Sequence, residues 1–493
     1  MPEELKVLFL SAEAEPFVKI GGLGDVAGSL PPALKSLGGI DIRVAIPFHG
    51  AIQRQSYPLS RAASFEIPFR DGVVHVEGLV TEVRGVTFYL IAGDLMPADA
   101  PVYTANPGVD GYKFTFFSLA ALELARRLGW SPDILHANDW HTAPAIYALW
   151  LRRNTDALFN NTATVLGLHN LPYLGVGAGQ AMQDFGLPPA SSSALPWWAQ
   201  DMPLPLGLLS ADHIVAASPT YAREILTPEF GSGLEGFLKT RKARISGILN
   251  GIDTSRWDPS AESAIPAQYD FDHLDRRWKN KAALLREFGL SPEPDSPLLG
   301  MVTRIDPQKG IDLVPPALRM VEKQSWQAIF LGTGMPAVEK AIRLLEKDFP
   351  DRVRAAIRFD ALLSRRIYAG ADILLIPSRY EPCGLTQMIA MRYGCIPLAR
   401  ATGGLKDTIR DTDAGKDSTG FLFKRAAPQD LAKSLIRSFD AYTSPEGWRS
   451  MQRNCMVQDF SWERFARQYA VLYQKLAENR EKEFSHGQHN SHV

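Results

Sequence analysis

The chain has 493 residues, of which 45% are hydrophobic and 22% are charged, and its formal net charge at pH 7 is -1. This length is about three times that of an average domain, so we expect two large lobes or three smaller domains, each with a sizeable core. The near-zero charge excludes a positive electrostatic field over the whole protein that would attract nucleic acid or an acidic membrane surface. An anionic partner therefore has to be bound by specific local groups.

The N-terminal segment MPEELKVLFLSAEAEP carries two glutamates before a short apolar run. A secretory signal would have a basic start and a longer apolar stretch, so we do not expect one. No segment approaches the roughly 18 unbroken apolar residues of a membrane span, so we expect no membrane association. The three cysteines, Cys383, Cys395 and Cys455, are widely spaced, which favours a reducing cytoplasm over a disulfide framework.

Short apolar runs bounded by Gly, Pro or Asp predict β-strands, and helical patterns lie between them. In chain order these runs are KVLFLSA, IRVAIPF, TFYLIAG, DILHAND, TATVLGLHN, DHIVAAS, LLGMVTR, WQAIFLGTG and DILLIPS. Strands that alternate with helices predict parallel sheets built by right-handed crossovers. The periodicity breaks between about Asp253 and Pro297. We therefore predict an α/β protein with two doubly wound, Rossmann-like lobes and an interdomain cleft at the carboxyl ends of their strands.

The predicted organisation has four segments. We assign 1–255 to the first lobe, 256–457 to the second lobe, 458–476 to a terminal helix and 477–493 to a disordered tail. The tail reads ENREKEFSHGQHNSHV, which is polar enough for disorder. We interpret its histidines, His486, His489 and His492, as solvated side chains rather than metal ligands.

The first predicted strand runs into KIGGLGDV, residues 19–26, just before a predicted helix. Glycines there let the backbone approach a ligand and present N–H groups at a helix start, which suits phosphate oxygens, and Lys19 adds a positive charge. The spacing matches neither GxGxxG nor GxxxxGK. A glycine-rich turn without a ligand therefore stays an alternative at this stage.

Two later strands of the first lobe end in polar residues. DILHANDWHTAP supplies His136, Asp139 and His141, and TATVLGLHN supplies His169 and Asn170. A metal cluster is one interpretation of HxxDxH, but no further ligand stands at a suitable spacing, so we expect no metal. We interpret these side chains as hydrogen-bonding groups for a sugar.

The second lobe carries two motifs after strands. RIDPQKG places Arg304 and Lys309 five residues apart, where two cations could neutralise a departing diphosphate. SRYEPCGLTQM places Glu381 before a tight turn, with the amides of Gly384, Leu385 and Thr386 available to a phosphate. A carboxylate accepts hydrogen bonds without donating any, which suits the hydroxyls of a sugar. No basic partner for a thiolate lies near Cys383 in the sequence, so we interpret this residue as a packed turn residue rather than a nucleophile.

These motifs occur together and in order in one known family. AEAEPFVKIGGLGDVAGSLP, HANDWHTAP, LHNLPYLG, SPTYAREI, GLEGFL, GILNGID, RIDPQKG, LGTGMP, SRYEPCGLTQM and RATGGLKDTI cover nearly the whole chain up to the tail. The sequence thus resembles the bacterial glycogen synthases and plant starch synthases, which are retaining glycosyltransferases of the GT-B fold.

The resemblance implies a role for each candidate residue. The implied donor-phosphate contacts are Lys19, Gly21 and Gly22, with the turn Gly384, Leu385 and Thr386. Arg304 and Lys309 resemble the essential cationic pair of the family, and Glu381 resembles the glutamate that binds the donor glucose. Of the remaining candidates, His169 matches the histidine near the reacting sugar carbon, and the acidic residues that line the same cleft are Asp139 and Glu13. The final helix resembles one that returns to the first lobe.

The resemblance implies transfer of glucose from ADP-glucose to the non-reducing end of an α-1,4-glucan such as glycogen, with retention of configuration. It implies no cofactor and no metal, because the cations take the place of one. The alternatives are UDP-glucose as the donor, a phosphorylase or epimerase on the same scaffold, and a catalytically inactive glucan-binding protein. Ile389 stands where the family usually has an aromatic residue, and the stretch 204–208 lacks the usual lysine, so donor preference stays open. The sequence leaves the oligomeric state unknown.

Overall fold

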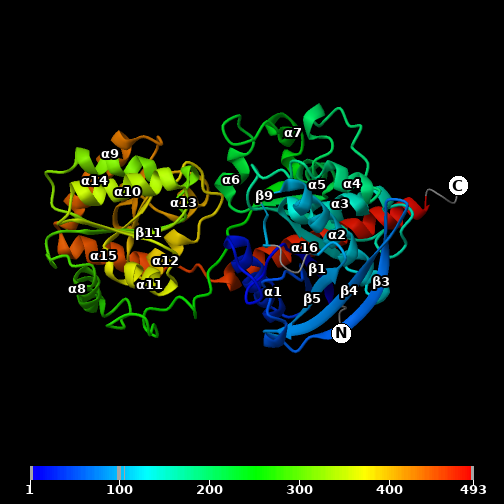
Figure 1. The fold of residues 1–493 in the computed structure, drawn as a ribbon, viewed down its shortest axis with the longest axis horizontal. Helices are drawn as coiled ribbons and strands as arrows, with labels where there is room; N and C mark the ends of the chain where they lie inside the picture. Colours follow the sequence, from blue (N-terminus) through cyan, green and yellow to red (C-terminus); the bar gives the residue numbers. More distant parts are fainter. Residues whose placement is uncertain (1–3, 97–100, 105, 490–493) are drawn as a thin grey trace. The chain divides into compact units, whose positions relative to one another are not determined.

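The computed structural model describes residues 4–96, 101–104 and 106–489. The chain divides into two compact units, shown as a ribbon in Figure 1. Unit 1 comprises Met1–Gly251 and Trp462–Val493, and unit 2 comprises Ile252–Ser461. The boundaries expected from the sequence were 255/256 and 457/458.

Unit 1 contains a nine-stranded sheet. In spatial order its strands are β3 (Ser60–Phe69), β4 (Gly72–Val83), β5 (Val86–Gly93), β2 (Ile40–Pro47), β1 (Leu5–Leu10), β6 (Ile134–Asn138), β7 (Ala163–Leu168), β8 (His213–Ala216) and β9 (Ile245–Gly247). Its helices are α1 (Gly22–Ser36), α2 (Pro107–Arg127), α3 (Asp139–Arg152), α4 (Gly179–Asp184), α5 (Pro203–Ser210), α6 (Pro219–Glu224), α7 (Glu235–Thr240) and α16 (Trp462–His489).

The sheet of unit 1 is not wholly parallel, which corrects the expectation from the sequence. Strand β4 pairs antiparallel with β3 and with β5. Arg84 and Gly85 join β4 to β5 and both have positive φ, as in the two-residue turns that suit a hairpin. A parallel connection needs a long crossover, so this short turn forces an antiparallel pair.

Unit 2 contains a six-stranded sheet in which every pairing is parallel. In spatial order its strands are β12 (Val353–Ile357), β11 (Gln327–Gly332), β10 (Leu298–Val302), β13 (Ile373–Ile376), β14 (Ile396–Arg400) and β15 (Phe421–Phe423). Its helices are α8 (Arg277–Glu287), α9 (Val314–Met320), α10 (Pro336–Asp348), α11 (Ala361–Gly370), α12 (Thr386–Arg392), α13 (Gly403–Thr408), α14 (Pro428–Tyr442) and α15 (Pro445–Met456). The α/β class and the two lobes are therefore confirmed, with a wholly parallel sheet in unit 2 and a mainly parallel sheet in unit 1.

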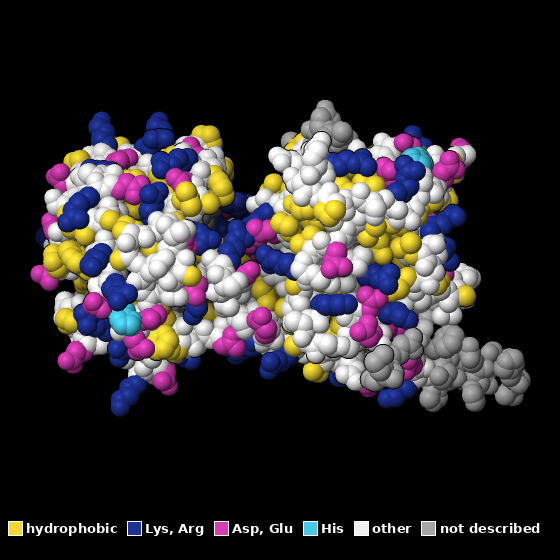
Figure 2. Space-filling view, turned by 90° about the horizontal axis from the view of Figure 1, so that it is seen from below, with side chains coloured by type: hydrophobic (Ala, Val, Ile, Leu, Met, Phe, Trp, Pro, Cys, Tyr) yellow, Lys and Arg dark blue, Asp and Glu magenta, His cyan; other side chains and the backbone are white. Residues whose placement is uncertain are grey.

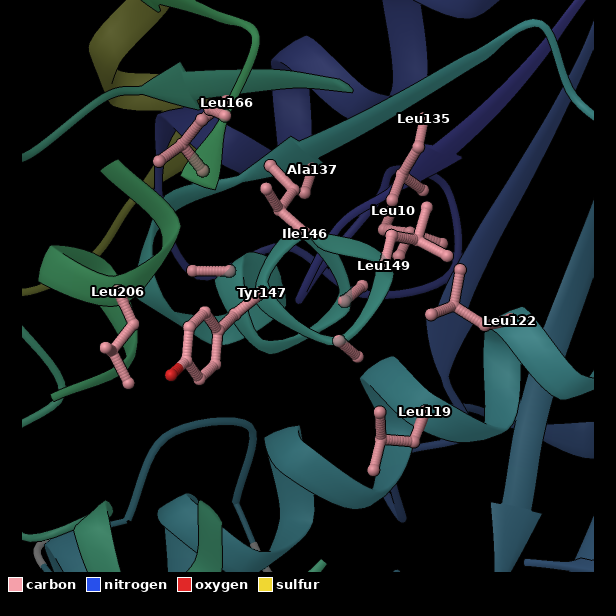
Figure 3. Close-up of a cluster of buried hydrophobic side chains, with 14 of the residues drawn as sticks. Leu10, Leu119, Leu122, Leu135, Ala137, Ile146, Tyr147, Leu149, Leu166 and Leu206 are labelled. Carbon is pink, nitrogen blue, oxygen red and sulfur yellow. The ribbon is translucent and has the colours of Figure 1, made fainter. Parts of the chain in front are cut away.

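The central strands of unit 1 are largely buried on both faces, which explains why their sequences are mostly apolar. On one face, side chains of β1, β6 and β7 pack against α2, α3 and α5 (Figure 3). The labelled members of this cluster are Leu10, Leu119, Leu122, Leu135, Ala137, Ile146, Tyr147, Leu149, Leu166 and Leu206. On the other face, Val7 and Phe9 of β1 belong to a second cluster that includes Tyr469 and Tyr473 of α16.

Helix α16 belongs to unit 1 and packs against α1, which Figure 1 shows in red beside blue. The prediction of a disordered tail over 477–493 is wrong for 477–489, because α16 continues to His489. Arg480 pairs with Glu483 one turn later and donates to the carbonyl of Asn160, so this part of the helix has both a local and a tertiary support. Residues 490–493, including His492, lie outside the described residues, as do the side chains of His486 and His489.

The surface carries both signs of charge. On the face shown in Figure 2, Lys and Arg side chains are interspersed with Asp and Glu over both units. Within the part of the chain that the structure describes, none of the helices combines the length and the apolar character that crossing a membrane requires.

In each sheet the chain adds parallel strands first on one side of the first strand and then on the other. This change of side lies between β1 and β6 in unit 1 and between β10 and β13 in unit 2. In open α/β sheets, ligands bind outside the carboxyl ends of the strands at this topological switch point. A ligand site is therefore expected in the loops that follow these four strands.

Candidate active site

The switch point of unit 2 brings Lys309 and Glu381 together. The two residues are 72 positions apart in the sequence, but the loops that follow β10 and β13 lie beside each other because the strands are paired. The Nζ of Lys309 donates to both carboxylate oxygens of Glu381, at 2.9 and 2.7 Å. Ser378 also donates to Glu381, from Oγ to Oε2 at 2.9 Å, and the Glu381 side chain is buried. A cation and a carboxylate are thus in direct contact at this edge.

The conformation of the β10 loop depends on Asp306 and Gly310. The Asp306 carboxylate accepts from the amide of Lys309 at 3.1 Å and so caps the short 3-10 helix Pro307–Lys309. Gly310 has a φ of 64°, and a Cβ there would lie 2.0 Å from the carbonyl oxygen of Pro377. Only glycine allows this close approach, which presses the Lys309 loop against the loop that carries Glu381.

Arg304 lies on the same loop as Lys309 but remains largely in solvent. Its side chain is 62% exposed, and its guanidinium is 3.4 Å from the Asp306 carboxylate. An exposed pair of this kind contributes little to stability, so the guanidinium is available to an anion at little energetic cost.

The turn Gly384, Leu385 and Thr386 leads directly into α12, which starts at Thr386. No side chain caps this helix start among the residues that the structure describes. The amide of Gly404, at the start of α13, donates to the carbonyl of Glu381 at 3.1 Å and holds the turn from the other side. Backbone amides at such a helix start attract the oxygens of an anion.

Phe359 is a further residue of this edge, and no sequence motif identified it. It lies between β12 and α11 and is 88% exposed, whereas most large apolar side chains of the unit are buried. Asp360 fixes the loop by accepting from the amide of Leu363 at 2.9 Å. An exposed aromatic ring offers a face on which a planar base can stack.

The switch point of unit 1 contains Glu13 in the loop after β1. Its carboxylate accepts from the amides of Ile20 and Gly21, the latter at 3.2 Å, and from the side chain of Tyr103. Burial raises the pKa of Glu13, and these hydrogen bonds oppose the rise. The Gly21 amide is therefore engaged by Glu13, which differs from the expectation that both glycine amides face a phosphate. Gly22 begins α1, and no hydrogen-bond acceptor for its amide is found among the described residues.

Lys19 is paired with an acidic residue of α1. Its Nζ lies 2.6 Å from Oδ1 of Asp25, and the lysine side chain is 37% exposed. An anion that approached Lys19 would meet a partly neutralised cation. The binding of a phosphate here would therefore involve an exchange of partners at the ammonium group.

Asp139 and His169 are brought together by the neighbouring strands β6 and β7. The Oδ1 of Asp139 accepts from the backbone amides of His169 and Asn170, at 2.7 and 3.2 Å. Burial raises the pKa of Asp139 and lowers that of His169, and their mutual attraction opposes both shifts. The imidazole of His169 is thus kept neutral near pH 7.

The interpretation of the whole HxxDxH motif as sugar-binding is wrong for His136 and His141. His136 is 1% exposed and contacts the Tyr473 hydroxyl through Nδ1, while His141 packs among the rings of Tyr103, Phe114 and Trp140. Burial lowers the pKa of both histidines to about 3. Within the described ranges, no group of three or more His, Cys, Asp or Glu side chains is placed to hold a metal ion.

Each switch point therefore contains part of the predicted set. Unit 2 joins Arg304, Lys309, Glu381 and the 384–386 turn at one edge, and unit 1 has Glu13, Asp139 and His169 on the loops after β1, β6 and β7. Sequence reasoning missed Ser378, Tyr103 and Phe359. Ser378 stands inside a quoted motif and could have been found there, whereas Tyr103 and Phe359 have no local signal.

Two family models match the chain. The model of the starch synthase catalytic domain matches residues 6–240, and the model of the group 1 glycosyl transferases matches residues 286–453.

Curated relatives match over almost the whole chain. Glycogen synthase of Anaeromyxobacter sp. (strain Fw109-5) is 39% identical over 485 residues, which cover 96% of this chain and 100% of that protein. Glycogen synthase of Cellvibrio japonicus (strain Ueda107) is 38% identical over 494 residues, with 95% and 99% covered.

Solved structures match as well. The catalytic domain of starch synthase IV from Arabidopsis thaliana, bound to ADP and acarbose, has a TM-score of 0.86 at 32% identity and covers 96% of this chain and 100% of that one. Sucrose-phosphate synthase from Thermosynechococcus elongatus has a TM-score of 0.59 at 18% identity over 96% of this chain and 99% of that one, which is a likeness of fold alone.

Proposed function

Since the chain belongs to the glycogen and starch synthase family of glycosyltransferases, we propose that it transfers glucose from ADP-glucose to the non-reducing end of an α-1,4-glucan. The anomeric configuration is retained in this proposal. The observation that carries it is the contact between Lys309 and Glu381 beside the exposed Arg304. Cations suit a diphosphate and a carboxylate suits hydroxyl groups, so this site matches a substrate in which a diphosphate is bonded to a sugar.

The proposed roles in unit 2 follow from hydrogen-bonding capacity. Lys309 has three N–H groups and gives two to Glu381, so one remains for an oxygen of the donor diphosphate. Arg304 and the 384–386 amides add further positive charge where negative charge develops on the leaving diphosphate. Preorganised donors of this kind lower a barrier more than they stabilise the bound substrate. Glu381 accepts hydrogen bonds from hydroxyls of the donor glucose.

The proposed transfer breaks the bond between the anomeric carbon and the diphosphate oxygen and forms a bond to an acceptor hydroxyl oxygen. We favour a front-face reaction, in which the departing diphosphate accepts the proton of that hydroxyl. A two-step route would need a carboxylate nucleophile, and the carboxylates of Glu13, Asp139 and Glu381 are engaged by amides or side chains. In this proposal Lys19 and Gly22 contact the donor phosphates, and His169 binds a hydroxyl near the reacting carbon.

The choice of ADP-glucose rests on the relatives. The Arabidopsis starch synthase structure contains ADP, and its likeness to this chain extends over 96% of the residues. The exposed ring of Phe359 supports a stacked base, although a stacking face accepts either adenine or uracil. UDP-glucose is therefore an outcome of the test below.

We further propose that the protein works in the cytoplasm without a cofactor or a metal. Its three cysteines are buried, and none of them forms a disulfide within the described residues, as suits a reducing compartment. Arg304 and Lys309 supply the positive charge that a metal ion would bring to the diphosphate.

The experiment that tests the proposal offers radiolabelled ADP-glucose and UDP-glucose separately, with glycogen as primer. We expect label from ADP-glucose to enter polymer and to be released by an α-1,4-specific amylase. Label from UDP-glucose alone would overturn the donor assignment. Glycogen binding without incorporation from either donor would identify an inactive glucan-binding protein instead.

A further inference from the structure

Asn138 is a buried residue that none of the functional assignments uses. It is the last residue of β6, immediately before Asp139, and its side chain is fully buried. Its Nδ2 donates to the backbone carbonyl of Leu10 on β1 at 2.8 Å. Its Oδ1 lies 3.0 Å from Nε2 of His169 on the loop after β7. One amide therefore connects the neighbouring strands β1 and β6 to the histidine.

The contact with Leu10 determines which way the amide faces. A carbonyl oxygen accepts hydrogen bonds only, so the group that faces Leu10 has to be the NH₂ group of Asn138. The group that faces His169 is then the amide oxygen, which is also only an acceptor. The hydrogen bond between Asn138 and His169 consequently requires a proton on Nε2 of the imidazole.

From this geometry we infer that Asn138 is a positioning residue that holds His169 as the neutral Nε2–H tautomer. The other ring nitrogen, Nδ1, then keeps its lone pair and acts as a hydrogen-bond acceptor. In the proposed reaction, on which this consequence rests, Nδ1 accepts a hydrogen bond from a glucose hydroxyl. In the opposite tautomer the same nitrogen would be a donor and would favour a different orientation of that hydroxyl.

Gly167 makes the contact sterically possible. It faces Asn138 in the register of β6 and β7. A Cβ at this position would lie 2.5 Å from Oδ1 of Asn138 and 2.8 Å from Nε2 of His136, and the latter atom has no hydrogen-bond partner among the described residues. Only a residue without a side chain leaves room here for both the Asn138 amide and the His136 ring.

The groups that face His169 do not compete for Nε2. The Asp139 carboxylate accepts from the backbone amide of His169, and the nearby His136 is kept neutral by burial. Burial also lowers the pKa of His169, against the opposing effect of Asp139. The ring therefore has one proton near pH 7, and the Asn138 amide decides which nitrogen carries it.

The direct test is nitrogen NMR of the full chain labelled with ¹⁵N in the histidine rings, without substrate. His169→Gln identifies the signals of His169. We expect a protonated Nε2 and an unprotonated Nδ1 in the unaltered protein near pH 7.5. A protonated Nδ1, or an equal mixture of the two tautomers, would overturn the inference.

Two substitutions separate a positioning role from a structural one. Asn138→Asp keeps an acceptor facing Nε2 and adds a negative charge, which raises the pKa of His169. We expect it to keep the Nε2–H tautomer and to move the acidic limb of the pH profile of kcat to higher pH. Asn138→Leu removes the acceptor, and we expect mixed tautomers and a loss of kcat of about tenfold or more.

Asn280→Leu is the matched control. Asn280 is also a buried amide, and its side chain bonds the backbone nitrogen and oxygen of Ala267 in unit 2 at 2.9 and 2.8 Å. We expect this variant to lose stability without any change in the His169 signals. An unchanged pH profile in Asn138→Asp would overturn the inference even if Asn138→Leu does not fold.

The tautomer is measured without substrate, so its outcome is independent of the donor and acceptor assays. Failure of the proposed function would leave the expected NMR result unchanged. If the enzyme is active but His169 has the Nδ1–H tautomer, the role inferred for Asn138 is wrong and the proposed function still stands.

Discussion

The switch points of the two units use their carboxylates differently. In unit 2, Glu381 is bonded by the side chains of Lys309 and Ser378, so its partners are groups that can turn toward a ligand. In unit 1, Glu13 and Asp139 are bonded mainly by backbone amides, and burial raises the pKa of both. A carboxylate held by backbone amides organises loops, whereas one held by a lysine takes part in an exchangeable ionic contact. In the proposed reaction, unit 2 therefore contacts the charged part of the substrate, whereas the loops of unit 1 are ordered around a neutral histidine.

The largest expected effect tests the ionic contact in unit 2. Lys309→Ala or Glu381→Ala should lower kcat by about 10²- to 10³-fold, because each removes a preorganised group that acts on developing charge or on the donor glucose. Steady-state rates with ADP-glucose and glycogen measure the loss.

Arg425→Ala is the control for the loss of a cation in the same unit. Arg425 is exposed and paired with Asp430, so its removal should leave the rate nearly unchanged. Near-normal kcat in Lys309→Ala would show that Lys309 does not stabilise the diphosphate. The contrast drawn between the carboxylates of the two units would then have no functional meaning.

The next effect tests the close approach of two loops in unit 2. Gly310→Ala should destabilise the protein by about 2–4 kcal/mol, because alanine there combines a positive φ with a backbone clash. Urea denaturation measures the loss, and kcat should fall because Lys309 is displaced.

Gly289→Ala separates the two causes. Gly289 has a φ of 66° but no atom within 4 Å of an added Cβ, so the substitution should cost only about 1 kcal/mol. Equal losses in the two variants would contradict the role assigned to the contact with Pro377.

Acid should affect the two units in different pH ranges. Burial lowers the pKa of four histidines of unit 1 to about 3 or 4, and these residues are His49, His136, His141 and His213. In the unfolded chain these histidines have their ordinary pKa of 6.5 and take up protons below that pH, whereas in the folded chain they stay neutral. The stability of unit 1 therefore falls as the pH drops from about 6.5 toward 3. The raised pKa values of Glu13 and Asp139 act in the opposite direction and offset part of this loss.

Unit 2 contains one histidine, His273, which is exposed and paired with Asp270. Its acid sensitivity comes from carboxylates with lowered pKa values, such as Glu262 and Asp312, so its stability is lost only below about pH 4.5. Hydrogen exchange followed by mass spectrometry at pH 7.5, 6 and 5 should show protection lost first in peptides of unit 1. Earlier loss in unit 2 would reverse the comparison.

The smallest expected effect concerns metals. If Arg304 and Lys309 provide the charge that the diphosphate needs, dialysis against EDTA should leave kcat unchanged. A loss of activity that Mg²⁺ or Mn²⁺ restores would show that the cations of unit 2 are not sufficient.

The sequence alone predicted the α/β class, nine of the strands and the loops in which the candidate residues stand. These features depend on local patterns, since a buried parallel strand is a continuous apolar run and a functional loop follows its carboxyl end. The missed elements show the limit of such patterns. Strands β3 and β4 are the last two strands at one end of their sheet, where alternating exposure removes the continuous apolar signal. The helix beyond residue 476 was missed because its support includes the distant Asn160.

Only the tertiary structure decided which partner each functional group contacts. Lys309 and Glu381 are 72 residues apart, and His136 meets Tyr473 across 337 residues. Contacts of this kind are set by the order of strands in a sheet and by the packing of helices on it, which no local spacing records. The sequence therefore determined the chemical groups and the edges on which they lie, and the packing of distant segments determined their partners, their burial and their protonation.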